Sequence, residues 1–393
     1  MLVSTLLALA PALALAAPAT VIDKRAPIIE PRGATIIPGK YIVKFKDGSS
    51  SASIDAALAK LSHKADHVFK AGQFKGFAGK ISEEHLETIQ SIPEVEYIEL
   101  DSVYKINTYV SQTGAPWGLG AISHHAASTT YVYDSSAGAG TCAYIIDTGI
   151  YTAHSQFGGR ATWLANYAGD GSDTDGNGHG THVAGTVGGS TYGVAKATKL
   201  YAVKVLDASG SGTNSGVIAG INFVATDSKT RSCPNGTVAN MSLGGSKSTA
   251  TNSAAAALVS AGVFLAVAAG NDNANAANYS PASESTVCTV AASTSANAKA
   301  SYSNYGALVD IWAPGTNVLS SWIGSTTATN TISGTSMATP HITGLGAYLL
   351  TLFGPKTPAA LCAFIASTAT NGLLTGVPSG TVNKLAFNSN PSA

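Results

Sequence analysis

The stretch Ala143-Tyr144-Ile145-Ile146-Asp147-Thr148-Gly149 decides the fold class of this chain. It is a short apolar run that ends in a carboxylate at a glycine turn, as a buried strand does. Similar runs recur downstream at 200–205, 238–241, 263–268 and 287–291, and helix candidates lie between them at 180–187, 216–226 and 248–261. Strands that alternate with helices pair in parallel, so the pattern predicts an α/β fold with a doubly wound, mainly parallel sheet.

Candidate catalytic side chains follow from this arrangement, because the site of such a sheet lies beyond the carboxyl ends of its strands. Asp147 follows the first predicted strand, and Asn271 follows the strand predicted at 263–268. The segment Asn177-Gly178-His179-Gly180-Thr181-His182-Val183-Ala184-Gly185 places a histidine before an apolar helix. The segment Gly334-Thr335-Ser336-Met337-Ala338-Thr339-Pro340-His341 places a serine among small residues. A serine hydroxyl needs a neighbouring base to become a nucleophile.

Each of these residues also has a purely structural interpretation. Asp147 before Thr-Gly can form a turn, and Ser336 can be the N-cap of a helix. His179 and His182 stand three residues apart, a spacing that also fits a metal pair. A zinc site needs further ligands, however, and no Cys or Glu stands nearby in that segment.

The three motifs, in the order Asp, His, Ser, resemble those of the subtilisin-like serine proteases. Other segments narrow the resemblance to the proteinase K group: Ala115-Pro116-Trp117-Gly118-Leu119, Ala202-Val203-Lys204-Val205-Leu206-Asp207 and Asn278-Tyr279-Ser280-Pro281-Ala282-Ser283. The likeness runs from roughly residue 110 to the C-terminus. It implies that Ser336 is the nucleophile, that His179 is the base and that Asp147 orients the imidazole. His182 is then structural.

The resemblance also implies an oxyanion site and a substrate cleft. Asn271 matches the residue whose side-chain amide binds the oxyanion, and the backbone N–H of Ser336 is the expected second donor. Ser209-Gly210-Ser211-Gly212 and Ser242-Leu243-Gly244-Gly245 resemble the two edge segments that bracket a substrate strand in this family. Glycine in them permits close main-chain approach, so a substrate can add as a β-strand. The expected substrate-binding residues are Ser209, Gly210, Ser211, Gly212, Ser242, Leu243, Gly244, Ala268, Ala269 and Gly270. The pocket segments 242–244 and 268–270 carry no charge, which predicts broad specificity with a preference for apolar or aromatic residues before the scissile bond.

Four cysteines allow three disulfide pairings if they form two bridges. The resemblance favours Cys142–Cys233 and Cys288–Cys362, and it implies one structural calcium ion bound by Ser285, Val287 and Asp310. Two backbone carbonyls and a carboxylate are hard ligands of the kind that calcium accepts. The acid of a second, weaker calcium site in this group is replaced by Leu373, so we expect only one ion.

Three segments fit the N-glycosylation pattern, at Asn235, Asn240 and Asn278. The last two fall in segments expected to face the substrate, so only Asn235 is predicted to carry a glycan.

The N-terminal part differs in chemistry from the rest of the chain. Residues 1–19 read as a secretory signal peptide, although the usual positive n-region is missing; a membrane anchor is the alternative, but Pro11 and Pro18 interrupt the apolar run. Residues 20–107 hold more than half of the charged residues, and a β-α-β-β-α-β order at about 38–104 resembles an inhibitor I9-type propeptide, a small α+β ferredoxin-like domain. Its end is expected between about residues 105 and 110, and 108–393 form the subtilisin-like peptidase domain.

Charge and composition limit the partners of this chain of 393 residues. The formal net charge is +0, so neither nucleic acid nor an anionic membrane is an expected partner. We expect a secreted, monomeric serine endopeptidase that acts on proteins and peptides and is inhibited by its own propeptide. Hydrolysis of esters by the same acyl transfer is one alternative. A non-catalytic binding protein on the same scaffold is another, although no triad residue is lost.

Overall fold

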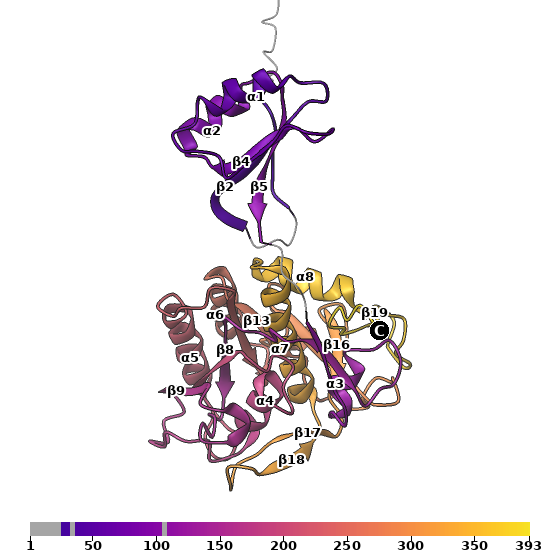
Figure 1. Cartoon of the computed structure of the whole chain (residues 1–393). Coiled ribbons are helices and arrows are strands. Elements are labelled where there is room, and N and C mark those ends of the chain that lie inside the picture. The colour runs from indigo at the N-terminus through magenta and orange to yellow at the C-terminus, as the bar shows by residue number, and fades with distance from the viewer. Residues whose placement is uncertain (1–24, 32–35, 104–107) are drawn as a thin grey trace, which may run out of the picture. The chain divides into compact units, whose positions relative to one another are not determined.

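The computed structural model describes residues 25–31, 36–103 and 108–393. The chain divides into two compact units, a smaller one up to Val103 and a larger one that continues to Ala393 (Figure 1). The predicted signal peptide, residues 1–19, lies outside the described residues. So do positions 105–107, which make up part of the range in which the propeptide is expected to end.

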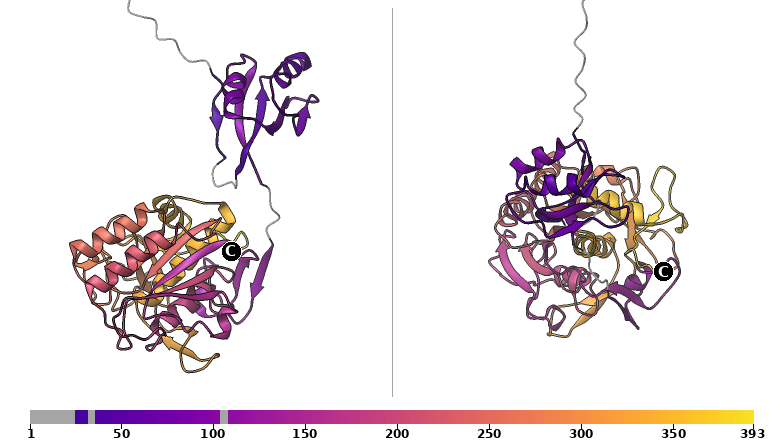
Figure 2. Two further views of the ribbon diagram at one scale, coloured as in Figure 1. Left: turned by 90° about the vertical axis from the view of Figure 1, so that its left-hand side faces the viewer. Right: turned by 45° about the horizontal axis from the view of Figure 1, so that its top comes forward.

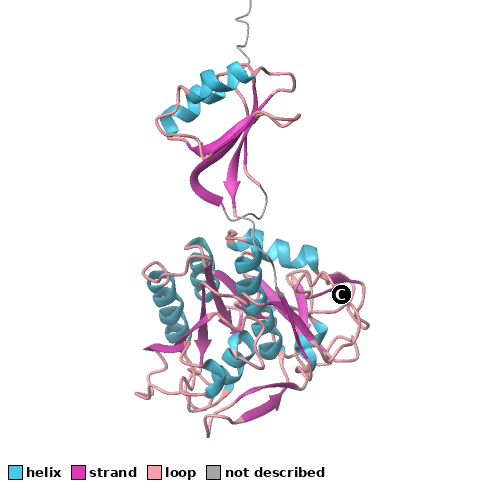
Figure 3. Ribbon diagram, viewed as in Figure 1, coloured by secondary structure: helices cyan, strands magenta, loops and turns pink. Residues whose placement is uncertain are grey.

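The described residues of the smaller unit form a five-stranded sheet with two helices. Its strands have the order β1-β5-β2-β4-β3, and β2 is antiparallel to both of its neighbours. Both helices cover one face of the sheet (Figure 3). Ile54 of α1 and Ile89 of α2 are buried in its core. The elements are β1 (Ile28–Ile29), β2 (Ile36–Phe45), α1 (Ser51–Leu58), β3 (His67–Phe69), β4 (Gly76–Lys80), α2 (Glu83–Gln90) and β5 (Val95–Ser102).

The predicted β-α-β-β-α-β order of this unit is confirmed from β2 to β5. Apolar positions at helical spacing predict the first helix of this unit at 55–62. The helix begins four residues earlier, at Ser51. Ser50 is the reason, because its side chain accepts a hydrogen bond from the Ser53 N–H and caps the helix there.

The larger unit is built on a nine-stranded sheet with the order β19-β20-β16-β15-β13-β11-β8-β10-β9. All of its described strand pairs are parallel except β19 with β20, so the predicted doubly wound, mainly parallel sheet is confirmed. The strands are β8 (Thr141–Asp147), β9 (Ala161–Asn166), β10 (Lys199–Lys204), β11 (Gly236–Met241), β13 (Phe264–Ala268), β15 (Cys288–Ser293), β16 (Ile311–Pro314), β19 (Thr370–Asn371) and β20 (Lys384–Leu385).

Helices cover both faces of this sheet (Figures 1 and 2). Along β8, Ala143 and Ile145 join the core under α4 and α7, whereas Tyr144 and Ile146 join the core under α5 and α6. Successive side chains of a strand point to opposite faces, so one apolar run fills both layers. The helices are α3 (Trp117–Ala121), α4 (His179–Gly188), α5 (Asn214–Asp227), α6 (Thr249–Ser260), α7 (Thr335–Phe353) and α8 (Pro358–Thr368), with short 3-10 turns η1 (Ser155–Phe157) and η2 (Ala276–Asn278).

In the part of the larger unit that the structure describes, there are also three two-stranded ribbons and two disulfides. The ribbons are β6 (Tyr109–Gln112) with β7 (Tyr131–Asp134), β12 (Gly245–Ser246) with β14 (Tyr279–Ser280), and β17 (Val318–Ser321) with β18 (Thr329–Ile332). Cys142 is bonded to Cys233 and Cys288 to Cys362, which is the pairing that the resemblance implied. Within the described residues, no single helix has the length and apolar character of a membrane span; α7 and α8 pass that test only as a pair bent by 96°.

Candidate active site

Asp147 and His179 meet at the carboxyl edge of the sheet. Asp147 is the last residue of β8 and is fully buried, and His179 is the first residue of α4. The imidazole Nδ1 lies 2.7 Å from Asp147 Oδ1, and the Thr148 N–H donates to the same oxygen at 2.7 Å. Burial lowers the pKa of His179, but the charge and hydrogen bond of Asp147, with a further contribution from the charge of Asp175, raise it above its ordinary value.

Ser336 is the second residue of α7 and lines the same cleft as His179. Its hydroxyl donates to the Ser242 carbonyl at 3.1 Å. Pro340 lies four residues further along the helix and has no N–H, so it cannot donate to the Ser336 carbonyl as a helical residue would. The Ser242 hydroxyl donates to that carbonyl instead, at 2.7 Å. Ser242 and Ser336 are thereby held together by two reciprocal contacts.

The side-chain amide of Asn271 has a defined orientation beside Ser336. Its Oδ1 accepts hydrogen bonds from the N–H and the hydroxyl of Thr335, at 2.8 and 2.9 Å. The Nδ2 group therefore remains as a donor toward the cleft that Asn271 and Ser336 both line. Gly270 before it has φ +105°, and a Cβ there would collide with the Asn304 side chain, so glycine is required.

Asn304 is a supporting residue that the sequence reasoning missed. It is fully buried, and its Oδ1 accepts from the Asp272 and Ala274 N–H groups at 3.0 and 2.9 Å. Its Nδ2 donates to the Ala269 carbonyl at 2.9 Å. The loop that carries Asn271 is thus held by one side chain from a segment some thirty residues away, and no local pattern marked that side chain.

Two adjoining pockets flank Ser336. The first is lined by both predicted edge segments and includes Gly210, Ser211, Gly212, Ser242, Leu243 and Gly244. The second is lined by Leu243, Gly244, Gly245, Ser246, Ala268, Gly270, Asn271, Asp272, Tyr279, Thr335 and Ser336. Two predicted substrate-binding residues line neither pocket. Ser209 uses its N–H and hydroxyl to bond Asp207, at 2.8 and 2.6 Å, and Ala269 is fully buried.

The second pocket contains a charge that the sequence reasoning did not include. Asp272 is exposed in its lining, directly after Asn271. Its carboxylate lies close to Tyr279, whose pKa is raised by partial desolvation and then by the charge and hydrogen bond of Asp272. The segments 242–244 and 268–270 are uncharged as predicted, but the pocket that they form has an acidic residue in its wall.

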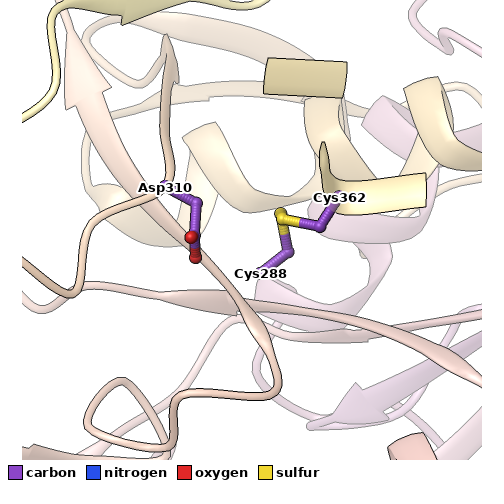
Figure 4. A group of neighbouring side chains, drawn as sticks. All are labelled: Cys288, Asp310 and Cys362. Atoms are coloured by element: carbon purple, nitrogen blue, oxygen red, sulfur yellow. A yellow bond between two sulfur atoms is a disulfide. The ribbon is translucent and has the colours of Figure 1, made fainter. Parts of the chain in front are cut away.

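Asp310 lies beside the Cys288–Cys362 disulfide (Figure 4). Burial raises the pKa of Asp310 to about 6, although the Thr289 N–H donates to its Oδ2 at 2.8 Å. The sulfur atoms are bonded to each other and cannot act as thiolate ligands. What remains is a desolvated carboxylate next to the segment that holds Ser285 and Val287, and such oxygen donors fit calcium.

The remaining predictions concern a second calcium ion near Leu373 and the glycosylation sites. Leu373 lines a separate pocket whose wall has no acidic side chain: Trp117, Ala121, His124, Ala126, Ala127, Ser128, Thr129, Ser295, Asn297, Leu373 and Leu385. The amide of Asn235, the predicted glycosylation site, donates to the Ala139 carbonyl at 2.8 Å and is half-buried. Asn240 is fully buried, whereas Asn278 is exposed.

Comparison with known proteins gives consistent matches along the chain. A family model described as "Subtilase family" matches residues 138–385, and one described as "Peptidase inhibitor I9" matches residues 40–107. The cuticle-degrading protease of Metarhizium anisopliae is 58% identical over 389 residues, covering 98% of this chain and 99% of that protein. Proteinase R of Parengyodontium album is 55% identical over 364 residues, covering 92% of each. A solved structure of a cold adapted subtilisin-like serine proteinase matches with a TM-score of 0.66 and 43% identity, over 70% of this chain and 99% of that one.

Proposed function

The chain belongs to the subtilase family and is a serine endopeptidase, and from this premise we propose that it cleaves peptide bonds through an acyl-enzyme on Ser336. The observation that carries the proposal is the 2.7 Å contact between His179 Nδ1 and Asp147 Oδ1, in the cleft that Ser336 also lines. Family membership sets aside the non-catalytic alternative.

Each member of the triad has a role that follows from its surroundings. The Ser336 hydroxyl turns from the Ser242 carbonyl toward His179, gives up its proton and attacks the peptide carbonyl. His179 later returns the proton to the leaving amine. Asp147 holds the imidazole through Nδ1, which leaves Nε2 to accept the proton, and its buried charge stabilises the imidazolium.

The oxyanion of the tetrahedral intermediate is stabilised by two donors. One is Asn271 Nδ2, because Thr335 occupies the Oδ1 of the same amide. The other is the Ser336 N–H, which lies in the first turn of α7 and has no helical acceptor. Both donors are in place before the reaction, so little reorganisation is required when the charge develops.

The substrate lies as an extended strand between the segments 210–212 and 242–244 and bonds through its main chain. Main-chain recognition accounts for broad specificity. The residue before the scissile bond enters the pocket lined by 243–246, Ala268 and 270–272, whose glycine and alanine positions leave room for apolar or aromatic groups.

The enzyme is made as a secreted precursor. Residues 1–19 direct secretion, and residues 20–107, which include the match to peptidase inhibitor I9, inhibit the peptidase until they are removed. A single calcium ion bound by Asp310 and the carbonyls of Ser285 and Val287 stabilises the peptidase domain, residues 108–393.

The test is labelling with a serine-directed fluorophosphonate followed by mass spectrometry of the secreted protein. We expect one labelled serine, Ser336, and a mature N-terminus between about residues 105 and 110. Ser336→Ala should lose both the label and nearly all peptide hydrolysis. Ser333→Ala, a change at an exposed serine three residues away, should keep both. A label that persists in Ser336→Ala would refute the assignment.

A further inference from the structure

Asp175 is a buried carboxylate next to the catalytic pair. It lies in the loop before α4, only 4% of its surface is exposed, and no lysine or arginine among the described residues forms an ion pair with it. Burying a charge without a counter-ion is costly unless hydrogen bonds satisfy it. Asp175 therefore needs a set of donors, and the surrounding loop supplies them.

Five hydrogen bonds end on the two oxygens of Asp175. Oδ1 accepts from the Thr148 hydroxyl at 2.9 Å and from the N–H groups of Asn177 and Gly178 at 3.1 and 2.8 Å. Oδ2 accepts from the N–H and hydroxyl of Thr181 at 2.9 and 2.6 Å. The carboxylate thus binds the backbone on both sides of His179.

Thr148 connects this carboxylate to the other half of the catalytic pair. Its hydroxyl donates to Asp175 and accepts from the Gly180 N–H at 2.9 Å. Its own N–H donates to Asp147 Oδ1, the oxygen that also contacts His179. A Cβ on Gly180 would collide with the Gly149 carbonyl, so α4 packs directly on the turn after β8.

The charged and titratable groups nearest His179 lie on β8, in the loop before α4, on α4 itself and on β10. Asp147 contributes a negative charge from β8, and Asp175 contributes a second one from the loop before α4. His182, on α4 itself, is held neutral because burial lowers its pKa to about 4. The ammonium group of Lys204, on β10, donates to the Thr148 carbonyl at 3.1 Å and pairs with Asp170.

We propose that Asp175 is a positioning residue for the His179–Asp147 pair. Its hydrogen bonds hold the start of α4 against Thr148, and its charge favours the imidazolium that forms when His179 takes the serine proton. The inference rests on the proposed triad.

The test compares Asp175→Asn with Asp173→Asn. Asp173 is an exposed carboxylate in the same loop, so its replacement controls for a long-range change in charge. Asparagine at 175 keeps the size but presents an NH₂ group to donors, which displaces the start of α4. We expect kcat to fall by roughly ten- to a hundredfold, since small misplacements of catalytic groups have effects of this order, with KM within about twofold. Asp173→Asn should match the wild type.

The pH profile separates charge from geometry. Losing the negative charge of Asp175 lowers the pKa of His179, so the acidic limb of kcat/KM should move to lower pH in Asp175→Asn. Thr148→Val removes the connecting hydroxyl and keeps the charge, so it should lower kcat without moving that limb.

Several outcomes would overturn the inference. An Asp175→Asn enzyme with wild-type kcat and an unmoved acidic limb would do so, even if it melts at a lower temperature, because its role would then be structural only. Wild-type kcat in Thr148→Val would remove the connection to Asp147. If too little mature Asp175→Asn is obtained for kinetics, Thr148→Val alone tests the proposal, and wild-type kcat in that variant would overturn it. Ser336→Ala is assayed in parallel, because activity in that variant would refute the triad itself.

Discussion

At the residue scale, the site depends on which way two side chains present their polar groups. Asn271 can present its Nδ2 because Thr335 binds its Oδ1 from two sides. Ser336 is held ready by Ser242, which bonds both its hydroxyl and its carbonyl. A substitution that replaces a single polar atom at one of these positions should therefore lower kcat and leave KM unchanged.

Replacing Asn271 tests the oxyanion donor. Asn271→Asp keeps the oxygen that binds Thr335 and replaces the donor with an acceptor, whereas Asn271→Ala removes both. Both variants should keep KM and lose kcat, by roughly 10²–10³ for Asn271→Ala, a magnitude taken from the oxyanion asparagine of subtilisin rather than calculated from this site. Steady-state kinetics on a peptide substrate is the measurement. Unchanged kcat in Asn271→Asp would show that Nδ2 does not bind the oxyanion.

The carboxylate of Asp272 should modify specificity. A long cationic side chain can lay its methylene groups along the apolar pocket and place its charge near Asp272. Asp272→Asn should lower kcat/KM for lysine before the scissile bond by about two- to fivefold, as expected for an exposed ion pair. The value for phenylalanine should stay constant. The ratio of kcat/KM for lysine to kcat/KM for phenylalanine should therefore fall in Asp272→Asn, and it should also fall for the wild type at high salt. If this ratio responds to neither change, Asp272 does not take part in substrate recognition.

If His179 is the base, as proposed, the pH dependence of turnover follows from the pKa of its imidazole. Its folded-state pKa is raised, and only the neutral imidazole can take the serine proton. Activity should therefore fall as the pH drops through a value above 6.5, the ordinary pKa of histidine. A pH series of kcat/KM measures this limb, and a midpoint below 6.5 would contradict the raised pKa.

At the scale of elements, the starts of β15 and β16 are joined to each other and, through a disulfide, to α8. The Asp310 N–H donates to the Thr289 carbonyl, and the Thr289 N–H donates back to the Asp310 carboxylate. The disulfide to α8 begins at Cys288, directly beside this contact. An ion at Asp310 would hold two strands and a helix together.

Removing calcium should lower the melting temperature of the inhibited enzyme. Ligand at a hundredfold excess over Kd stabilises the folded state by about 2.7 kcal/mol. Asp310→Asn should melt lower than the calcium-loaded wild type and should not respond to chelator. Melting scans with and without chelator are the measurement, and an equal chelator shift in both proteins would remove Asp310 from the metal site.

The pH dependence of the chelated proteins has a defined sign. The folded-state pKa of Asp310 is raised to about 6, so the unfolded chain loses this proton first as the pH rises. The free energy of unfolding should therefore decrease between about pH 4 and pH 6, because the folded state binds the extra proton there. In chelator, Asp310→Asn should be more stable than the wild type at pH 8, and the difference should disappear near pH 4. The same order of stability at both pH values would contradict a buried, uncompensated charge.

At the scale of the whole molecule, two units of unlike chemistry share one chain. The smaller unit falls within the charge-rich segment, and the larger unit is a sheet filled by apolar residues on both faces. If the enzyme itself cleaves off the smaller unit, a variant that lacks the nucleophile should retain this unit.

Ser336→Ala expressed alone should accumulate with residues 41–100 still attached. Adding a trace of active enzyme should release the larger unit, with a new N-terminus between about residues 105 and 110. Intact mass and N-terminal sequencing provide the measurement. Normal processing of Ser336→Ala in the absence of active enzyme would mean that another protease removes the segment.

The sequence by itself determined the fold class and the order of the catalytic motifs. Apolar runs such as 143–146 encode a strand locally, and glycine turns at their ends mark where Asp147 and Asn271 stand. The element order of the smaller unit was equally readable, although the start of α1 was misplaced because a single capping serine, Ser50, decides it.

Only the tertiary structure decided which of the polar loop residues support the site. Asp173 and Asp175 are two acids in one polar loop and look alike in sequence, yet one is exposed and the other is buried under Thr148 and Thr181. Asn304 binds a loop about thirty residues away. Asp272 and Tyr279 line one pocket together with residues 243–246 and 335–336, which are distant in sequence. Burial and hydrogen bonding of such side chains depend on distant segments that meet only in the folded chain, so no local pattern records them.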